Sequence, residues 1–477
     1  MRDATLAYKN DTPYAISRLR LIAAMSLALI ASACFFLLAT FAPAAQATQQ
    51  TFDLNAAIAN ASDGQTLTVP AGVHVGPFVI DRPLTLVAES GAILDGQGTG
   101  DVIQINSPHV TVRGFVIRNT GDILDRENSG IVVTNAGHVI IEDCTLRDVL
   151  FGIYLKNSPN SIVRRNTITS KPLGLARRGD CIRVWASDNT TVNDNTVNDG
   201  RDVVLWYSEN LVVQRNIVTD SRYGLHFMYA ANATVEDNRL IHNSVGVFLM
   251  YTKNLIMRRN VMARNRGPSG FGIGIKDVDG ADIRDNLLID NRVGIHIDNS
   301  PSNIDLTHRF QGNILAYNDI GLGFMPNVTR NEFTQNAFCD NVQQIAVFGG
   351  GKFEGNRFTI EGKGNYWGDY RGFDFDGDGI GDMEHRAASV FENLMDRQPK
   401  LRLFLFSPAQ QAIGSAAKAF PIVKPKVRAV DTAPLMHPPR PASIAPPQHH
   451  NAASLWLASA LMLGSGAGVL FTGWRGF

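Results

Sequence analysis

The sequence predicts an all-β fold, a right-handed parallel β-helix in which each turn of the solenoid adds about 22 residues. The first observation is a short apolar segment that recurs at this interval, with a glycine near its start at Gly224, Gly246, Gly272 and Gly294. The second is an asparagine that recurs in step, at Asn166, Asn195, Asn216, Asn238, Asn260 and Asn286. The third is that these segments are rich in β-branched and aromatic residues and lack the 3.6-residue period of a helix.

The recurring asparagine predicts the corner of each turn. Asparagine tolerates a left-handed backbone, and its side chain can hydrogen-bond the equivalent asparagine of the next turn. We therefore expect left-handed asparagines that form a ladder along one corner, with the turns stacked about 4.8 Å apart. Ordinary turn punctuation is the alternative, but it would not recur in register.

Composition restricts the class of partner and of metal site. The 477 residues include 44 basic and 44 acidic side chains, so the net charge is zero, and no basic run exceeds two residues. These features argue against nucleic acid as a partner. Cys144, Cys181 and Cys339 lie far apart without CxxC spacing, so we expect buried thiols instead of zinc ligands or a disulfide.

The first 47 residues predict an export signal. Arg18 and Arg20 precede an apolar run from 21 to 41, and a small-residue cleavage site ends at Ala47. The mature protein would then be periplasmic. An uncleaved membrane anchor is the alternative, because the apolar run is long for a signal peptide.

The C-terminal end predicts a tether to the inner membrane. Residues 421–452 are rich in proline, as in an extended linker, and residues 453–474 are apolar over the about 20 residues that cross a bilayer. We expect a C-terminal transmembrane helix here. A sorting signal that is removed after export is the alternative.

The intervening chain divides by its pattern. Residues 48–100 are expected to form an N-terminal cap and the first coils, residues 101–361 the parallel β-helix, and residues 362–420 a distinct C-terminal region. Longer spacings at 171–179, 266–270 and 302–309 predict loops extruded from single turns.

Alternation along the strands sorts the side chains by face. Two columns are apolar throughout and are expected to fill the lumen: Leu225, Val247, Ile273 and Ile295, and Phe227, Leu249, Ile275 and Ile297. The intervening residues would point outward. They include a strip of large side chains that we interpret as a contact face for a partner: Trp185, Trp206, Tyr207, Tyr229, Phe248 and Tyr251.

Soft ligands on this outward face predict a copper site. His226 and Met228 lie two residues apart on one strand, roughly 7 Å apart at Cα, and Met250 would lie above Met228 on the next turn. Imidazole and thioether groups together favour Cu(I). The alternative is that the methionines are adaptable contacts for a partner protein.

Polysaccharide chemistry is the second interpretation of the outward face. A lyase or C5-epimerase would need a base and cations, and Arg183, Lys276, His296 and Asp298 are candidates. However, Lys276 and Asp298 would be stacked as an ion pair, and we expect no tight cluster of acids and bases on neighbouring turns. A carbohydrate-binding solenoid without catalysis is a third possibility.

A calcium-like motif follows the repeats. Asp374, Asp376, Asp378 and Asp382 occupy alternating ligand positions around Gly379, as in a calcium loop. The sequence predicts a structural calcium clamp that is not a complete EF-hand, because position 12 is a histidine. A solvated acidic turn is the alternative.

Several segments resemble the NosD family. They are VGVFLMYTKN from Val245, RNRGPSGFGIGIKDVDG from Arg264, GIHIDNSP from Gly294, NYWGDYRGFDFDGDGIGD from Asn365 and RLFLFSPAQQAI from Arg402. The resemblance implies a periplasmic accessory protein, not an enzyme, that helps assemble the copper clusters of nitrous oxide reductase. The implied partners are an ABC transporter complex of permease and ATPase, and the reductase or a copper chaperone.

Overall fold

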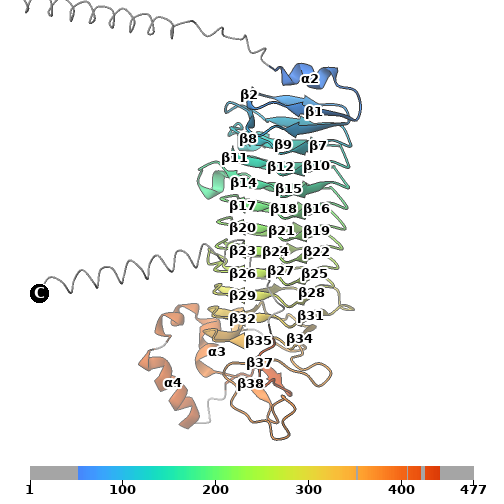
Figure 1. Ribbon diagram of the computed structural model, residues 1–477. Coiled ribbons are helices and arrows are strands. Elements are labelled where there is room, and N and C mark those ends of the chain that lie inside the picture. The colour runs from blue at the N-terminus through green and yellow to red at the C-terminus, as the bar shows by residue number, and fades with distance from the viewer. Residues whose placement is uncertain (1–51, 351–352, 406, 420–424, 441–477) are drawn as a thin grey trace, which may run out of the picture. The chain divides into compact units, whose positions relative to one another are not determined.

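The computed structural model describes residues 52–350, 353–405, 407–419 and 425–440 (Figure 1). The expected signal peptide and transmembrane segment lie outside the described residues, as does half of the proline-rich linker. None of the helices in the described ranges is long and apolar enough to span a bilayer.

A short helix begins the described chain. Helix α2 (Leu54–Asn60) starts at Asp53, whose side chain accepts a hydrogen bond from the main-chain N–H of Ala56 at 3.0 Å. Leu54 and Ile58 are buried, and the helix packs against the first strands at one end of the solenoid (Figure 1). It shields core and strand edges that would otherwise be open.

Three parallel sheets run along the solenoid, and each turn contributes one strand to each of them. Sheet A has 12 strands: β1 (Gln65–Val69), β4 (Leu84–Ala88), β7 (Thr111–Arg113), β10 (Ile140–Glu142), β13 (Ile162–Arg164), β16 (Thr191–Asn193), β19 (Val212–Gln214), β22 (Thr234–Glu236), β25 (Ile256–Arg258), β28 (Asp282–Arg284), β31 (His308–Gln311) and β34 (Asn331–Thr334). Sheet B has 13 strands: β2 (Gly72–Val75), β5 (Ala92–Asp95), β8 (Val116–Arg118), β11 (Thr145–Val149), β14 (Thr167–Ser170), β17 (Thr196–Asn198), β20 (Ile217–Thr219), β23 (Arg239–Ile241), β26 (Val261–Ala263), β29 (Leu287–Ile289), β32 (Ile314–Ala316), β35 (Ala337–Cys339) and β37 (Tyr366–Trp367). Sheet C has 12 strands: β3 (Phe78–Ile80), β6 (Ile103–Ile105), β9 (Ser129–Thr134), β12 (Phe151–Lys156), β15 (Ile182–Trp185), β18 (Asp202–Trp206), β21 (Tyr223–Met228), β24 (Val245–Met250), β27 (Phe271–Lys276), β30 (Val293–Asp298), β33 (Ile320–Phe324) and β36 (Gln343–Val347). The predicted parallel β-helix is therefore confirmed.

The two predicted lumen columns form the core of sheet C. Leu225 pairs in register with Val247, and Phe227 pairs with Leu249, and all four side chains are buried. The glycine just before the first column is required in each of these strands for a steric reason. A Cβ at Gly224 would lie 2.5 Å from the carbonyl oxygen of Gly246 on the next turn, so only glycine allows the turns to pack this closely.

The asparagine ladder is confirmed, but its expected backbone conformation is wrong. Asn216 donates from Nδ2 to Oδ1 of Asn238 at 2.9 Å, and Asn238 does the same to Asn260 at 2.9 Å. The left-handed residue is the one before each ladder asparagine, for example Arg215 (φ 53°) and Asp237 (φ 57°). The corner turns one residue earlier than expected, which leaves the asparagine side chain buried to satisfy main-chain groups of the neighbouring turns.

The structure contains a second asparagine ladder that was not predicted. It runs along the corner between sheets B and C and comprises Asn243, Asn265, Asn291, Asn318 and Asn341. Each of these residues lies two positions after the end of a sheet B strand. This regular spacing is visible in the sequence and could have predicted the ladder.

The C-terminal region closes the other end of the solenoid (Figure 1). Strands β38 (His385–Ala387) and β39 (Ala429–Asp431) form an antiparallel pair. Helix α3 (Val390–Arg397) packs on β36 and on the short helices η3 (Phe348–Gly350) and η4 (Pro399–Phe404), and it also contacts helix α4 (Pro408–Ala419).

Candidate functional site

The outward face of sheet C carries the predicted strip of large side chains. In register across successive turns lie Trp185, Trp206, Met228 and Met250, followed by Lys276 and Asp298. We call this row the Trp–Met row. The indole rings of Trp185 and Trp206 are 5.6 Å apart between centroids. The row therefore places two aromatic rings and two thioethers next to one another on the surface of four consecutive turns.

A tyrosine ladder lies beside the row, one residue after the strands end. Tyr207 and Tyr229 stack at 5.1 Å and 15°, and Tyr229 and Tyr251 stack at 4.8 Å and 9°. All three residues have left-handed backbones, with φ near 50°. Tyr207 and Tyr229 are 43% and 49% exposed. Because a neighbouring tyrosine covers each face of the Tyr229 ring, Tyr229 presents mainly its edge and hydroxyl group to solvent.

His226 occupies a closed environment on β21. The ring is surrounded by Trp206, Tyr223 and Phe248, with centroid distances of 5.1, 4.9 and 6.2 Å. Its side chain is only 5% exposed. Nδ1 lies 3.2 Å from Oδ2 of Asp202 on the preceding turn. Since a carboxylate only accepts, Nδ1 carries a proton, and Nε2 is the nitrogen that can offer a lone pair to a metal. Among the described residues, Nε2 has no hydrogen-bond partner.

Asp202 belongs to a buried ionic network that the sequence pattern did not predict. Arg222 pairs with Asp202 at 2.9 Å, and Arg201 pairs with Asp180 at 3.0 Å. Arg183 reaches Glu127, 2.6 Å away in the loop that follows η1 (Leu124–Arg126). The expectation of no tight cluster of acids and bases on neighbouring turns is therefore wrong. The residues are spread over turns and a loop that only the fold brings together.

The surroundings shift the pKa values of the two aspartates of the network in opposite directions. Burial and the nearby carboxylate of Asp202 raise the pKa of Asp180 above its ordinary value. Burial also acts to raise the pKa of Asp202, but hydrogen bonds from His226 and Arg222 outweigh it and lower that pKa. Asp180 and Asp202 are each 1% exposed, so a sugar chain cannot reach either carboxylate in this structure.

The other residues considered for polysaccharide chemistry do not converge. Arg183 is 9% exposed and engaged with Glu127. Lys276 and Asp298 lie 4.0 Å apart as an ion pair. His296 stacks on Phe271 at 4.3 Å, and burial lowers its pKa to about 4. These contacts engage each group locally and leave no open acid–base pair among them.

The acidic loop brings three of its four predicted ligands together. Carboxylate oxygens of Asp374, Asp376 and Asp378 all lie within 4.8 Å of one another. Hydrogen bonds from the main-chain N–H groups of Gly379 and Gly377 lower the pKa of Asp374. The fourth residue, Asp382, instead accepts a hydrogen bond from the main-chain N–H of Phe375 at 2.6 Å. The loop has the donor set of a hard cation site.

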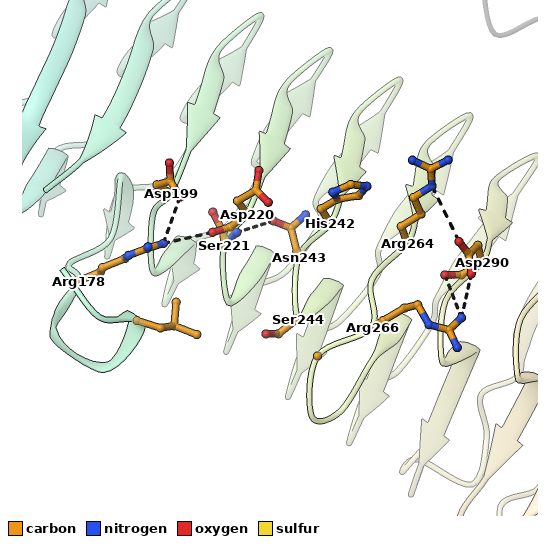
Figure 2. Close-up of a pocket in the computed structure, with 12 residues that line it drawn as sticks. Arg178, Asp199, Asp220, Ser221, His242, Asn243, Ser244, Arg264, Arg266 and Asp290 are labelled. Carbon is orange, nitrogen blue, oxygen red and sulfur yellow. Dashed lines mark hydrogen bonds and ion pairs between the residues drawn. The ribbon is translucent and has the colours of Figure 1, made fainter. Parts of the chain in front are cut away.

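A polar corner groove of about 650 Å³ lies between two of the predicted loops (Figure 2). At one end Arg178, next to η2 (Leu175–Arg177), pairs with Asp199 at 3.5 Å, and at the other Arg266 pairs with Asp290 at 2.8 Å. The positive charges of Arg178 and Arg266 at the two ends of the groove are thus neutralised. The residue spacing predicted the loops but not the groove, because the floor of the groove is the corner between sheets B and C.

The fold and site define a class: a parallel β-helix whose outward sheet carries aromatic, thioether and imidazole groups over a closed ionic network. Residues 101–222 match a family described as "Right handed beta helix region", and residues 165–372 match one described as "Periplasmic copper-binding protein (NosD)". The chain belongs to the NosD family, which confirms the resemblance seen in the sequence.

Two relatives carry the same name, "Probable ABC transporter binding protein NosD". The one from Pseudomonas aeruginosa is 36% identical over 386 residues, which cover 78% of this chain and 88% of the relative. The one from Stutzerimonas stutzeri is 31% identical over 429 residues, which cover 86% of this chain and 94% of the relative.

The similarity to solved structures is much lower. The catalytic unit of an α-1,3-glucanase from Streptomyces thermodiastaticus is 14% identical with a TM-score of 0.49, over 66% of this chain and 64% of that one. A mannuronan C-5 epimerase module from Azotobacter vinelandii is 13% identical with a TM-score of 0.43, over 66% and 94%. Such values carry no argument about activity.

Proposed function

We propose that this protein is a non-enzymatic accessory protein that passes copper, with an ABC transporter, toward the copper clusters of nitrous oxide reductase. The observation that carries the proposal is the group of His226, Met228 and Met250 on the outward face of sheet C. The family's description as periplasmic and copper-binding supports it, and so do the names of the two relatives.

The residues fit copper as cargo. Met228 and Met250 are register neighbours on adjacent turns, and His226 precedes Met228 by two residues on the same strand and face. One imidazole nitrogen and two thioethers make a soft, uncharged donor set that suits Cu(I) and not hard cations. The unpartnered Nε2 of His226 is a buried acceptor that a bound cation would satisfy. Asp202 fixes the tautomer, as carboxylates do for metal-bound histidines.

The contact face for a partner comprises the strip defined above. Exposed tyrosine edges beside a tryptophan and methionine row are typical of protein interfaces, where a few large side chains supply most of the binding energy. Candidates for the partner are the permease and ATPase complex, the reductase and a copper chaperone. A C-terminal membrane segment at 453–474 would tether the solenoid near the transporter.

A carbohydrate-binding role is less well supported by the same face. Sugars stack on exposed faces of aromatic rings, whereas tyrosine–tyrosine stacking covers both faces of Tyr229 and one face each of Tyr207 and Tyr251. The acids that a lyase or epimerase would need are buried in ion pairs. The site geometry therefore favours a protein partner over a polysaccharide.

The test is an anaerobic Cu(I) titration of the purified protein against a chromophoric Cu(I) chelator. The wild type is expected to bind one Cu(I), and a Met228→Leu/Met250→Leu variant to bind at least about tenfold more weakly, because it loses two of three ligands. A Met257→Leu variant is the control, since Met257 is buried in the core. Equal binding by wild type and double variant, or no binding by either, would overturn the site.

Calcium in the acidic loop is a separate proposal. Asp374, Asp376 and Asp378 would hold the ion as a structural clamp next to the last strands. The loop is far in sequence from the copper ligands, so its occupancy can be tested independently of copper.

A further inference from the structure

One aromatic residue lies beside two of the three members of the proposed copper site, Met228 and His226. Trp206 is the register neighbour of Met228, which in turn neighbours Met250. Its indole ring lies edge-to-face with the His226 ring, with centroids 5.1 Å apart and planes at 89°. No other tryptophan in the described ranges contacts His226. The position makes Trp206 part of the site and not only part of a docking surface.

We propose that Trp206 completes the copper site as a cation–π cap that makes it selective for a monovalent soft ion. The inference rests on the proposed function, because it assumes that His226, Met228 and Met250 bind copper. Three soft donors satisfy Cu(I) without water, whereas Cu(II) prefers harder and more numerous ligands. The electron-rich face of an indole attracts a cation that has lost its water, and it repels neither thioethers nor imidazole.

The indole ring of Trp206 already lies beside one positively charged side chain of the protein. The guanidinium carbon of Arg183 lies 5.8 Å from the centroid of the Trp206 ring. Glu127 compensates this positive charge at 2.6 Å, so Arg183 does not leave an unbalanced cation beside the copper site. The contact with Arg183 therefore shows that the Trp206 ring is compatible with a cation beside it.

In this proposal Trp206 is also the side chain that moves when a metal enters. Nε2 of His226 is inaccessible and without a partner, and so is the indole Nε1 of Trp206. A buried N–H without an acceptor costs free energy that rotation toward solvent recovers. Because Trp206 is only partly buried, its ring can swing outward, expose Nε2 and close again over the bound ion.

The experiment compares Trp206→Leu and Trp206→Phe with Trp185→Phe, a matched control on the preceding turn. Cu(I) affinity is measured by chelator competition, Ag(I) serves as a second monovalent soft ion, and tryptophan fluorescence is followed in both titrations. Trp206→Leu is expected to weaken Cu(I) and Ag(I) binding by about 3- to 30-fold, and Trp206→Phe by less, since a ring remains. Metal-dependent quenching should persist in Trp185→Phe and disappear in both Trp206 variants.

The outcomes separate the two proposals. If the wild type binds Cu(I) in a Met228- and Met250-dependent way but Trp206→Leu changes neither affinity nor quenching, the cap is wrong and the copper site stands. If the wild type binds no Cu(I), the copper site itself is wrong. Circular dichroism of Trp206→Leu establishes folding, and an unfolded variant is replaced by Trp206→Phe, whose loss of quenching at retained fold is the decisive result.

Discussion

Asp431 accepts a hydrogen bond from the main-chain N–H of Asn365 at 2.7 Å, although 66 residues separate the two. Asn365 is the last member of the first asparagine ladder, in which Asn336 donates to Asn365 at 2.9 Å. Each earlier asparagine of this ladder donates a hydrogen bond to the next asparagine. At the end of the solenoid the carboxylate of Asp431 takes that place, so β39 supplies the final rung and ties the C-terminal region to the last turn.

Replacing Asp431 should destabilise the closed end of the solenoid. Its buried carboxylate also accepts from Nε1 of Trp367 at 2.9 Å and from Oγ1 of Thr359 at 2.8 Å. Asp431→Ala leaves these donors unsatisfied, and we expect a loss of about 2–5 kcal/mol in free energy of unfolding. Chemical denaturation followed by circular dichroism measures it. Glu354→Ala, at an exposed site, should stay within about 0.5 kcal/mol. Equal midpoints for the two variants would contradict the capping role.

Asp202 should act on copper through His226. Asp202→Leu removes the acceptor that orients Nδ1, and we expect Cu(I) affinity to fall by about 10- to 100-fold, as for other partners of metal-bound histidines. Asp202→Asn keeps an acceptor oxygen and should recover part of the loss. The measurement is chelator competition, with Asp220→Asn as the control because Asp220 lies in the corner groove. Equal losses of Cu(I) affinity in the Leu and Asn variants would indicate that the role of Asp202 is purely structural.

Calcium should stabilise the C-terminal region if the acidic loop binds it. Melting curves with Ca²⁺ or with a chelator should differ for the wild type, since a ligand at 100 times its Kd adds about 2.7 kcal/mol. In Asp376→Asn/Asp378→Asn the difference should vanish. The amide oxygens still accept the turn hydrogen bonds that Asp376 and Asp378 now receive from Asp378 and Ile380. An unchanged shift in this variant would refute the site, and Mg²⁺ serves as the ion control.

Stability should fall as pH rises because of Glu392 on α3. Burial, with the carboxylates of Asp369 and Asp396 adding to it, raises the pKa of Glu392 from 4.5 to about 7. The folded state thus binds this proton more tightly than the unfolded state. Its contribution is fully favourable below pH 4.5 and is lost by about pH 7. Glu392→Gln should therefore raise the free energy of unfolding at pH 8 by about 1–2 kcal/mol, which a higher melting temperature reports. At pH 4.5 the substitution should change the melting temperature little. The reverse pattern would show that Glu392 is stabilised as an anion.

The regular part of the fold was predictable because its cause is local and repeated. Side chains alternate across a strand, so the apolar columns of Leu225 and Phe227 had to face the lumen once the period was known. The asparagine ladder followed in the same way. The error in its backbone conformation concerns a shift of one residue, and the repeat alone does not tell Arg215 from Asn216 at the corner.

The candidate site was only half visible in the sequence. The register of Met228 and Met250 follows from the repeat, and so does the placement of Trp206. The buried state of His226 does not, because it depends on rings contributed by three different turns. The ionic network around Asp180 was missed because Glu127 enters from a loop that breaks the repeat.

By itself the sequence determined the solenoid, its period, the lumen columns and the face that bears the aromatic and soft side chains, since these depend on residue spacing alone. Only the tertiary structure decided which groups are closed to solvent, which nitrogen of His226 is free and how Asp431 ends the ladder. Burial and hydrogen bonding depend on atoms that distant segments bring together, and spacing along the chain does not encode those distances.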